Sequence, residues 1–459
     1  MSSPAPSIAV LGAGITGLTA AHRLAAQGQR VTVFEQADRP GGVIGSEAVD
    51  GWLIEHGPNS LLANEPALAA LLDELNLGDE VRPANPTARK RFIVRDGRPV
   101  AAPMSPLSLL GTPLFSIGAK CRLLRELFQK PRQRESDVSL AALIAGHFGP
   151  EFVNYALNPF VSGVYAGDPE QLSAQYAFPA LWRHEQTCGS IIRGFLADAK
   201  ARRARGEARG GIISFRHGLQ TLTDALARSL PTVALRLNTT VEAIAPDSRW
   251  TVRTRANGET HSESFDRVIA TLPAGALAQL PVGADDARPL SVLSEILFPP
   301  VSALFLGYRR DQIAHPLDGF GMLVPAVEKL SVLGVLFSST LFPGRAPEGH
   351  VALTVMVGGT RQPDLAALSS DELLARIQPD LASLLGVHGA PVFQRHQHWP
   401  RAIPQYTLGH ERHLAAMTAC EEQFPGLLIG GQCRDGIAVP ACIAAGEKLA
   451  ARALGSDRA

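Results

Sequence analysis

The sequence predicts an α/β fold in which a mostly helical stretch interrupts strand-rich parts. Three observations support this fold class. A strand, a helix and a second strand occupy residues 8–34, residues 82–211 are rich in leucine-based helical segments, and strand character returns from residue 235 onward. Alternation of strands and helices at these lengths is typical of parallel sheets covered by helices, so the chain is expected to fold around such a sheet.

The expected elements follow in order along the chain. Ile8–Leu11 is an apolar run, Leu18–Gln27 has helical spacing until Gly28, and Arg30–Phe34 has the pattern of a strand. The helical stretch is expected to include helices at Lys120–Gln129, Ser139–His147 and Ala177–Lys200, separated by Pro and Gly. Later strands are expected at 235–237, 239–245, 250–254, 265–271, 303–308, 332–337, 351–357 and 427–429, with helices at 371–385 and from Pro440.

Composition and charge exclude several classes of protein. The 459 residues are 46% hydrophobic and 19% charged, which is enough to bury a core in about two to four structural units. Lys+Arg 43 and Asp+Glu 43 cancel, so no overall field favours a polyanion, and no nucleic-acid partner is expected. Five cysteines without a C-x-x-C pair are typical of reduced thiols, and no structural zinc is expected.

The first residues and the hydropathy pattern predict a cytoplasmic protein. Met1–Ser7 lacks the basic and apolar regions of a signal peptide. No window reaches the roughly 18 consecutive apolar residues of a spanning helix, because Glu295 and Pro299-Pro300 break the most apolar region. Peripheral contact with the inner face of the cell membrane stays open.

Gly12-Ala13-Gly14-Ile15-Thr16-Gly17 is a G-x-G-x-x-G motif between the first strand and the first helix, and Glu35 ends the second strand. Gly12 permits a tight turn, Gly14 lets the backbone approach a pyrophosphate at the positive helix terminus, and Gly17 lets helix pack on strand. Glu35 would accept hydrogen bonds from ribose hydroxyls. Together these features predict a Rossmann-type unit that binds an adenine dinucleotide, whereas the glycines alone would fit a structural turn.

A second set of glycines bears on which dinucleotide is bound. Arg39-Pro40-Gly41-Gly42 follows the second strand directly, and Gly430-Gly431 closes a strand near the far end of the chain. NAD domains hold the phosphates with their first βαβ unit, whereas an extended FAD needs a second contact surface. Together with Gly12–Gly17 and Glu35, these segments resemble the FAD-binding frame of the amine-oxidase and protoporphyrinogen-oxidase superfamily, in which the chain ends meet on one flavin.

Three further segments narrow the resemblance. Residues 158–169 (NPFVSGVYAGDP), 399–406 (WPRAIPQY) and 436–443 (GIAVPACI) are similar to signature stretches of oxygen-dependent protoporphyrinogen oxidases. The similarity therefore spans essentially the whole chain in order. One departure is Ala441, where the last signature often has an acidic residue, and it puts a local contact at the start of a helix in doubt.

The resemblance implies which residues contact FAD. Gly12 to Gly17 would hold the pyrophosphate, and Glu35 with Gln36 the ribose. Gly42 and Val43 would line the path toward the flavin, Gly57-Pro58-Asn59-Ser60 would lie near the isoalloxazine, and the Val241 backbone would meet the adenine. The ring end would be covered by Trp399, Ile437, Ala438 and Val439. A helix that begins at Pro440 independently favours negative charge on a reduced flavin, while an ordinary turn or core role for Gly57, Val241 and Trp399 stays open.

The resemblance also implies a division of the chain into domains. A discontinuous Rossmann-type FAD-binding domain would comprise residues 1–81, 212–285 and 411–459. Residues 82–211 would form a mostly helical insert, and residues 286–410 a mixed α/β substrate domain.

For function, the resemblance implies oxidation of protoporphyrinogen IX to protoporphyrin IX in haem biosynthesis. Dioxygen would reoxidise FAD and release hydrogen peroxide, and the product would be handed to the next haem-pathway enzyme. Because the flavin carries the chemistry, no catalytic acid–base pair is expected in the chain. Arg91 sits where the family places an arginine that pairs with a substrate propionate, and a solvated surface charge is its alternative.

Other functions stay open at this point. Coproporphyrinogen III, with four propionates in place of two, is an alternative substrate. Amine oxidases and carotenoid desaturases share the flavin frame but lack the Ile403-Pro404-Gln405-Tyr406 type of signature. A non-catalytic binding protein on the same frame would hold no flavin.

Two other patterns have competing interpretations. His396-x-His398 and His410-x-x-His413 have metal-like spacing but no accompanying acidic or Cys ligand, so no metal is expected. The basic runs Lys120–Arg134 and Arg202–Arg209 are interleaved with apolar residues. They fit a solvated helix face or a surface that docks on anionic lipid.

Overall fold

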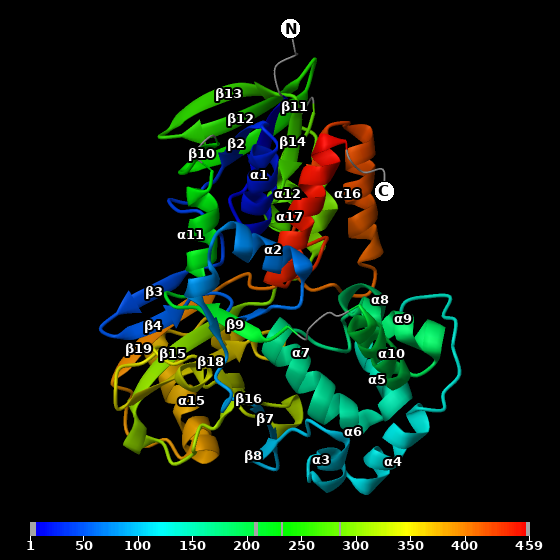
Figure 1. Ribbon diagram of the computed structural model, residues 1–459, viewed down its shortest axis with the longest axis vertical. Coiled ribbons are helices and arrows are strands. Elements are labelled where there is room, and N and C mark those ends of the chain that lie inside the picture. Colours follow the sequence, from blue (N-terminus) through cyan, green and yellow to red (C-terminus); the bar gives the residue numbers. More distant parts are fainter. Residues whose placement is uncertain (1–5, 206–209, 231–232, 284–285, 456–459) are drawn as a thin grey trace.

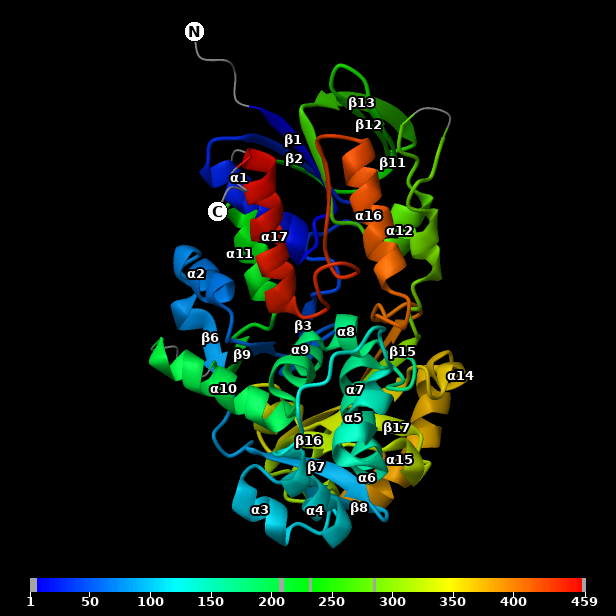
Figure 2. The ribbon, with the colours of Figure 1, turned by 90° about the vertical axis from the view of Figure 1, so that its right-hand side faces the viewer.

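The computed structural model describes residues 6–205, 210–230, 233–283 and 286–455. A parallel sheet lies at one end of the molecule with both described chain ends, and a second large sheet and the helical part lie at the other end (Figures 1 and 2). Residues 1–5 of the Met1–Ser7 stretch and residues 206–209 of the second basic run lie outside the described residues.

The parallel sheet confirms the predicted βαβ unit. Its strand order is β10 (Ala234–Arg236), β2 (Arg30–Phe34), β1 (Ser7–Leu11), β14 (Arg267–Ala270) and β20 (Leu427–Ile429). Helix α1 (Ile15–Ala26) connects β1 to β2, and β20 pairs with β14 although about 160 residues separate them. The two ends of the chain therefore meet in one sheet, as the discontinuous arrangement requires.

Successive residues of β1 face two different cores, because side chains alternate along a strand. Ile8 and Val10 pack in one core with residues of α1, α2 (Pro66–Glu74), α11 (Gln220–Arg228) and α17 (Val439–Leu454). Ala9 and Leu11 pack in the other with residues of β12 (Trp250–Ala256), α12 (Ala274–Gln279) and α16 (Glu411–Gln423). Near-continuous apolar runs are typical of strands that are covered on both faces.

One predicted strand divides between two sheets. The stretch 265–271, expected as a single strand, contains the end of β13 (Glu259–Phe265) and the whole of β14. β13 belongs to an antiparallel sheet with β12 and β11 (Thr239–Pro246), whereas β14 belongs to the parallel sheet. The chain changes partners at Asp266, whose carboxylate accepts a hydrogen bond from the Ser7 N–H (2.7 Å).

The second large sheet has seven strands, in the order β19 (Phe393–Trp399), β15 (Val301–Arg309), β18 (His350–Gly358), β17 (Val332–Leu336), β16 (Gly319–Leu323), β7 (Lys90–Arg95) and β8 (Arg98–Ala101). Helix α15 (Ser370–Leu385) covers one face. Residues 90–101, expected within the helical stretch, instead extend this sheet, because β7 pairs with β16 in parallel. The five-part domain division itself stays a prediction.

The helical part confirms helices near the predicted positions and corrects one of them. Its helices are α3 (Pro106–Gly111), α4 (Ile117–Glu126), α5 (Leu140–Phe148), α6 (Pro150–Phe152), α7 (Asn158–Tyr165), α8 (Ala174–Ala177), α9 (Pro179–Cys188) and α10 (Ile191–Ala204), with a π-helical turn at Val153–Leu157. The single helix expected at 177–200 is wrong. Gly189 takes the left-handed conformation (φ 74°) and Ser190 caps a new helix by accepting from the Arg193 N–H.

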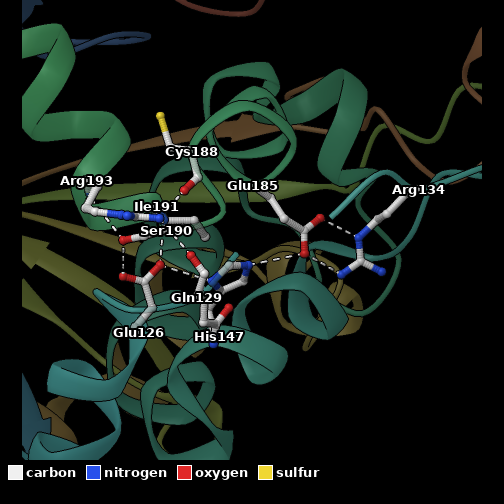
Figure 3. A network of polar contacts seen from close by, with 9 residues as sticks. All are labelled: Glu126, Gln129, Arg134, His147, Glu185, Cys188, Ser190, Ile191 and Arg193. Atoms are coloured by element: carbon white, nitrogen blue, oxygen red, sulfur yellow. Dashed lines mark hydrogen bonds and ion pairs between the residues drawn. The ribbon is translucent and has the colours of Figure 1, made fainter. Parts of the chain in front are cut away.

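A buried polar network ties these helices together (Figure 3). His147 on α5 contacts Glu126 of α4 through Nδ1 (3.0 Å) and Glu185 of α9 through Nε2 (3.2 Å). Ser190 donates to Glu126 (2.7 Å), and Arg134 forms a two-armed pair with Glu185. Burial disfavours both carboxylates, yet the donors around them hold the pKa values of Glu126 and Glu185 below the usual range.

Short elements complete the fold. They are β3 (Ser46–Val49) paired with β4 (Trp52–Glu55), β5 (Leu61–Leu62) and β6 (Val81–Pro83) flanking β9 (Ile212–Phe215), α13 (Ser338–Leu341), α14 (Pro363–Ala366), and 3₁₀ turns at Gly78–Glu80, Ser291–Glu295, Arg310–Gln312 and Ala326–Glu328. Among the described residues, no helix combines the length and the apolar character needed to cross a bilayer.

Candidate functional site

The first glycine turn is shaped as its spacing predicts. Gly12 has φ 99°, which glycine adopts without strain. A Cβ on Gly17 would lie 2.0 Å from the Gly12 carbonyl oxygen, so Gly17 permits α1 to pack on the turn. A Cβ on Gly14 would meet no atom within 4 Å, and no side chain caps the first turn of α1. The turn therefore presents an open, positive helix end.

A second glycine loop faces the first. Gly41 donates its N–H to the Ala13 carbonyl (2.8 Å), and a Cβ on Gly42 would lie 3.3 Å from the Gly14 Cα. The Arg39 guanidinium donates to the carbonyls of Pro40, Gly42 and Ile44, at 2.8 to 3.1 Å. Arg39 thus fixes the loop whose glycines approach the helix end.

Glu35 lies at the other side of the turn. Its carboxylate accepts hydrogen bonds from the Ala13 N–H (2.8 Å) and the Ala37 N–H (2.9 Å). An ionised carboxylate can accept about four hydrogen bonds, so two of its acceptor positions remain for hydroxyl groups.

These segments enclose a cavity of about 520 Å³. Of the predicted residues, those that line it are Gly12, Gly14, Ile15, Thr16, Glu35, Gln36, Gly42, Val43, Val241 and Val439. The lining residues that the sequence did not predict are Phe34, Ala37, Gly41, Ile44, Thr239, Thr240, Glu242, Thr271 to Ala274, Ala276, Gln279, Leu280, Phe298, Gly431 to Cys433 and Cys442. Gly41 and Gly431 stand within the pairs Gly41-Gly42 and Gly430-Gly431, so the sequence carries a signal for these two.

The N-terminus of a second long helix reaches the same cavity. Helix α17 begins at Val439, after the N-cap Ala438, and no side chain caps its first turn. Val439 and Cys442 line the cavity. Burial raises the pKa of Cys442 to about 11 and that of Cys433 to about 12, so both thiols stay protonated near neutral pH.

Several predicted residues do not line the cavity but lie close to residues that do. Ala13 and Gly17 belong to the first turn, and Ile437 and Ala438 directly precede α17. A Cβ on Gly57 would lie 2.1 Å from the carbonyl oxygen of Val43, a lining residue, which places Gly57-Pro58-Asn59-Ser60 beside the second loop. The Trp399 indole donates to the His56 carbonyl (3.0 Å), next to Gly57.

Arg91 lies apart from the lining residues. It is an exposed residue of β7, and its guanidinium stacks over Phe320 at 5.4 Å from the ring centre. Among the described residues no carboxylate lies within 4.0 Å of it, whereas the neighbouring Lys90 pairs with Asp318.

The three segments that carry the resemblance meet in space. Gln405 donates to the Tyr165 carbonyl (2.8 Å), which joins residues 399–406 to residues 158–169. Tyr406 accepts from the Gly436 N–H (3.0 Å), which joins the same segment to residues 436–443.

The paired histidines make other contacts. His396 and His398 both reach the Ser302 hydroxyl, at 2.8 and 3.2 Å. The Nδ1 atoms of His410 and His413 lie 3.4 Å apart, and burial lowers the pKa of His410 to about 4. In the part of the chain that the structure describes, no three His, Cys, Asp or Glu side chains are arranged to hold a metal ion.

Comparison with known proteins identifies the family. The model of the flavin-containing amine oxidoreductase family matches residues 15–454. The chain belongs to this family. It is 35% identical to protoporphyrinogen oxidase 2, chloroplastic/mitochondrial, of Arabidopsis thaliana, with 96% of this chain and 92% of the relative covered. It is 27% identical to coproporphyrinogen III oxidase of Staphylococcus aureus, over 97% of this chain and 98% of the relative.

The fold is likewise shared. A solved structure from Exiguobacterium superposes with a TM-score of 0.82, at 24% identity, over 99% of this chain and 100% of that one. The predicted family resemblance, the fold class and the FAD cofactor are confirmed, and the chain is a flavin oxidoreductase. The residues present fit the cofactor, since open space lies beside Gly14 and two uncapped helix ends reach one cavity.

Proposed function

We propose that this chain oxidises a porphyrinogen to a porphyrin, with protoporphyrinogen IX as the favoured substrate and dioxygen as the electron acceptor. The observation that carries the proposal is the similarity to proteins named protoporphyrinogen oxidase along nearly the whole chain. It is supported by the contacts that join residues 158–169, 399–406 and 436–443, because segments far apart in sequence meet in one place and Val439 and Cys442 of the last segment line the cavity.

The residues that line the cavity would hold FAD. The first turn of α1 and the Gly41-Gly42 loop would hold the diphosphate, because free N–H groups at a helix end favour an anion. Glu35 would accept from the ribose hydroxyls, and the backbone of Val241 would meet the adenine. Gly57 to Ser60, Trp399 and the residues before α17 would surround the flavin ring.

When bound, FAD would supply the redox chemistry of this oxidation, with dioxygen as the final electron acceptor and hydrogen peroxide as its product. The chain contributes position and electrostatics. The positive end of α17 would stabilise the negative charge that a reduced flavin carries at its pyrimidine edge. The protonated thiols of Cys433 and Cys442 would not serve as bases near neutral pH.

Arg91 would pair with one substrate propionate. Its guanidinium has no carboxylate within 4.0 Å among the described residues and lies over an aromatic ring, so it is available to an anion. In Arg91→Ala, loss of this pair should raise KM about tenfold while FAD occupancy stays unchanged. Lys90→Ala, which removes an equal charge from the neighbouring position, is the control, and equal KM values for wild type and Arg91→Ala would refute the role.

The decisive measurement is porphyrin fluorescence from protoporphyrinogen and coproporphyrinogen, supplied in parallel in air, with hydrogen peroxide measured alongside. Because porphyrinogens oxidise without a catalyst, the same protein without FAD sets the background rate. Faster formation of protoporphyrin is expected. Faster formation of coproporphyrin would instead favour the activity named for the Staphylococcus relative. No product from flavin-loaded protein would refute the proposal and would favour amine or desaturase chemistry.

We further propose that α3 and α4 dock on an anionic lipid surface, which would suit an apolar substrate. Leu107, Ile117 and Phe128 are 80 to 83% exposed, and Arg122 and Arg125 are exposed on α4 beside them. These helices lie at the end of the molecule away from the termini (Figures 1 and 2). Co-sedimentation with phosphatidylglycerol vesicles should be weaker for the double variant Leu107→Asp/Phe128→Asp than for the wild type. Val392→Asp, which changes an exposed apolar residue elsewhere, is the control and should sediment like the wild type. Equal sedimentation of all three proteins would refute the docking.

A further inference from the structure

Residues 399–406 resemble a family signature, yet none of them lines the cofactor cavity. The segment begins at Trp399, where β19 of the seven-stranded sheet ends, and finishes at Tyr406, which contacts Gln432 and Gly436. It therefore runs from the sheet to the loop that precedes α17.

Tyr406 makes the contact with this loop. Its side chain is buried, its hydroxyl donates to the Gln432 carbonyl, and it accepts from the Gly436 N–H (3.0 Å). Gln432 lines the cavity, as do Gly431 and Cys433 on either side of it. The Tyr406 hydroxyl thus hydrogen-bonds to both the first and the last residue of the loop 432–436. This loop ends two residues before the N-cap of α17.

The ring of Tyr406 is itself firmly held. It stacks on His410, with ring centres 4.2 Å apart and an angle of 16° between planes. The Tyr406 carbonyl accepts from the Ser173 N–H (2.8 Å), and the preceding Gln405 donates to the Tyr165 carbonyl (2.8 Å). Burial raises the pKa of Tyr406, so the hydroxyl keeps its proton and remains a donor to Gln432. The loop is therefore tied, through Gln405 and Tyr406, to Tyr165 and Ser173 of the helical part.

We propose that Tyr406 is a positioning residue, which holds the 432–436 loop and thereby the N-terminus of α17 against the ring end of FAD. This inference rests on the proposed placement of FAD in the cavity. A helix end acts on a nearby charge only within its first turn, so a small displacement of the loop would weaken its effect on the reduced flavin. Tyr406 would not touch the cofactor and would act through the loop.

Tyr406→Phe tests the proposal, because it keeps the stacked ring and removes only the hydroxyl. Tyr308→Phe is the matched control: Tyr308 is a buried tyrosine of β15, and its hydroxyl has no hydrogen-bond partner among the described residues. The measurements are the FAD dissociation constant of the apoprotein, the flavin midpoint potential, and amide hydrogen exchange of a peptide that covers 431–438.

In Tyr406→Phe, exchange of that peptide should speed up even in the FAD-free protein. The FAD dissociation constant should rise about tenfold and the midpoint potential should fall, while Tyr308→Phe leaves all three unchanged. Unchanged dissociation constant and potential in Tyr406→Phe, with or without a lower melting temperature, would overturn the positioning role. FAD binding that survives a valine at Gly14 would instead refute the placement of FAD, so the two failures are distinguishable.

Discussion

Replacing Gly14 by valine tests whether the open side of the first glycine turn receives the FAD diphosphate. Gly14 has φ −68°, which valine tolerates, and a Cβ there meets no protein atom within 4 Å. The added side chain should therefore cost the apoprotein only about 1 kcal/mol, from a poorer N-cap. In the loaded protein it would occupy the space of the diphosphate.

The expected loss of affinity follows from the N–H groups that the diphosphate would no longer reach. Hydrogen bonds to charged groups contribute about 1.5–3 kcal/mol each, so losing two of them costs roughly 3–6 kcal/mol. FAD affinity should fall about a hundredfold to ten-thousandfold. Fluorescence titration of apoprotein with FAD measures this change, and thermal unfolding of the apoprotein measures the fold.

Two matched variants separate the possible causes. Gly78→Val adds the same side chain at a position that is also open but lies in a 3₁₀ turn outside the cavity, and it should bind FAD normally. Gly17→Ala places a Cβ 2.0 Å from the Gly12 carbonyl oxygen and should destabilise the apoprotein itself. Wild-type affinity in Gly14→Val would refute the diphosphate site.

Three further substitutions test ionisable side chains that are buried outside the cavity. Arg345→Met should destabilise the fold by about 3–5 kcal/mol, because it leaves Glu55, 2% exposed and 2.7 Å away, without its cation; an unchanged denaturant midpoint would contradict this. Glu126→Gln should lower the melting temperature above about pH 4.5, and the melting temperatures of the variant and the wild type should converge at lower pH. The reason is that the pKa of Glu126 is depressed in the folded protein, so the stability that its carboxylate contributes is lost as pH falls. Parallel pH profiles of the two melting temperatures would count against this. Between pH 7 and pH 4 the wild type should lose roughly 3 kcal/mol more stability than His410→Phe. The pKa of His410 is about 4 in the folded protein and 6.5 in the unfolded chain, so protons bind the unfolded chain first as pH falls. Equal slopes of unfolding free energy against pH in the two proteins would disprove this.

Local sequence was sufficient for the first part of the cofactor site. Strand, glycine turn, helix and Glu35 lie within 30 consecutive residues, so steric and hydrogen-bonding rules that act between neighbours specify them. The same holds for β20 and the start of α17, where an apolar run, a glycine pair and Pro440 give local signals.

Tertiary contacts decided the rest. Residues 90–101 became sheet strands because β16, more than 200 residues later, offers a pairing edge. Residues 265–271 do not form one strand, because Phe265 pairs with β12 in one sheet and residues 267–270 pair with β1 in another. The helix expected at 177–200 ends at Cys188, because Gly189 takes the left-handed conformation. The strands β16 and β1, which pair with β7 and β14, lie far away in the sequence, so a short stretch of sequence does not predict the pairing.

By itself, the sequence determined the fold class, the family, the FAD cofactor and the glycine turn that opens α1, because each depends on residue order over short spans or on resemblance along the whole chain. Only the tertiary structure decided which residues share one cavity, that Arg91 lies outside it, and that Gln405 and Tyr406 together link three distant segments. Such contacts arise when the chain closes long loops around apolar cores, and loop closure brings together residues that no local periodicity relates.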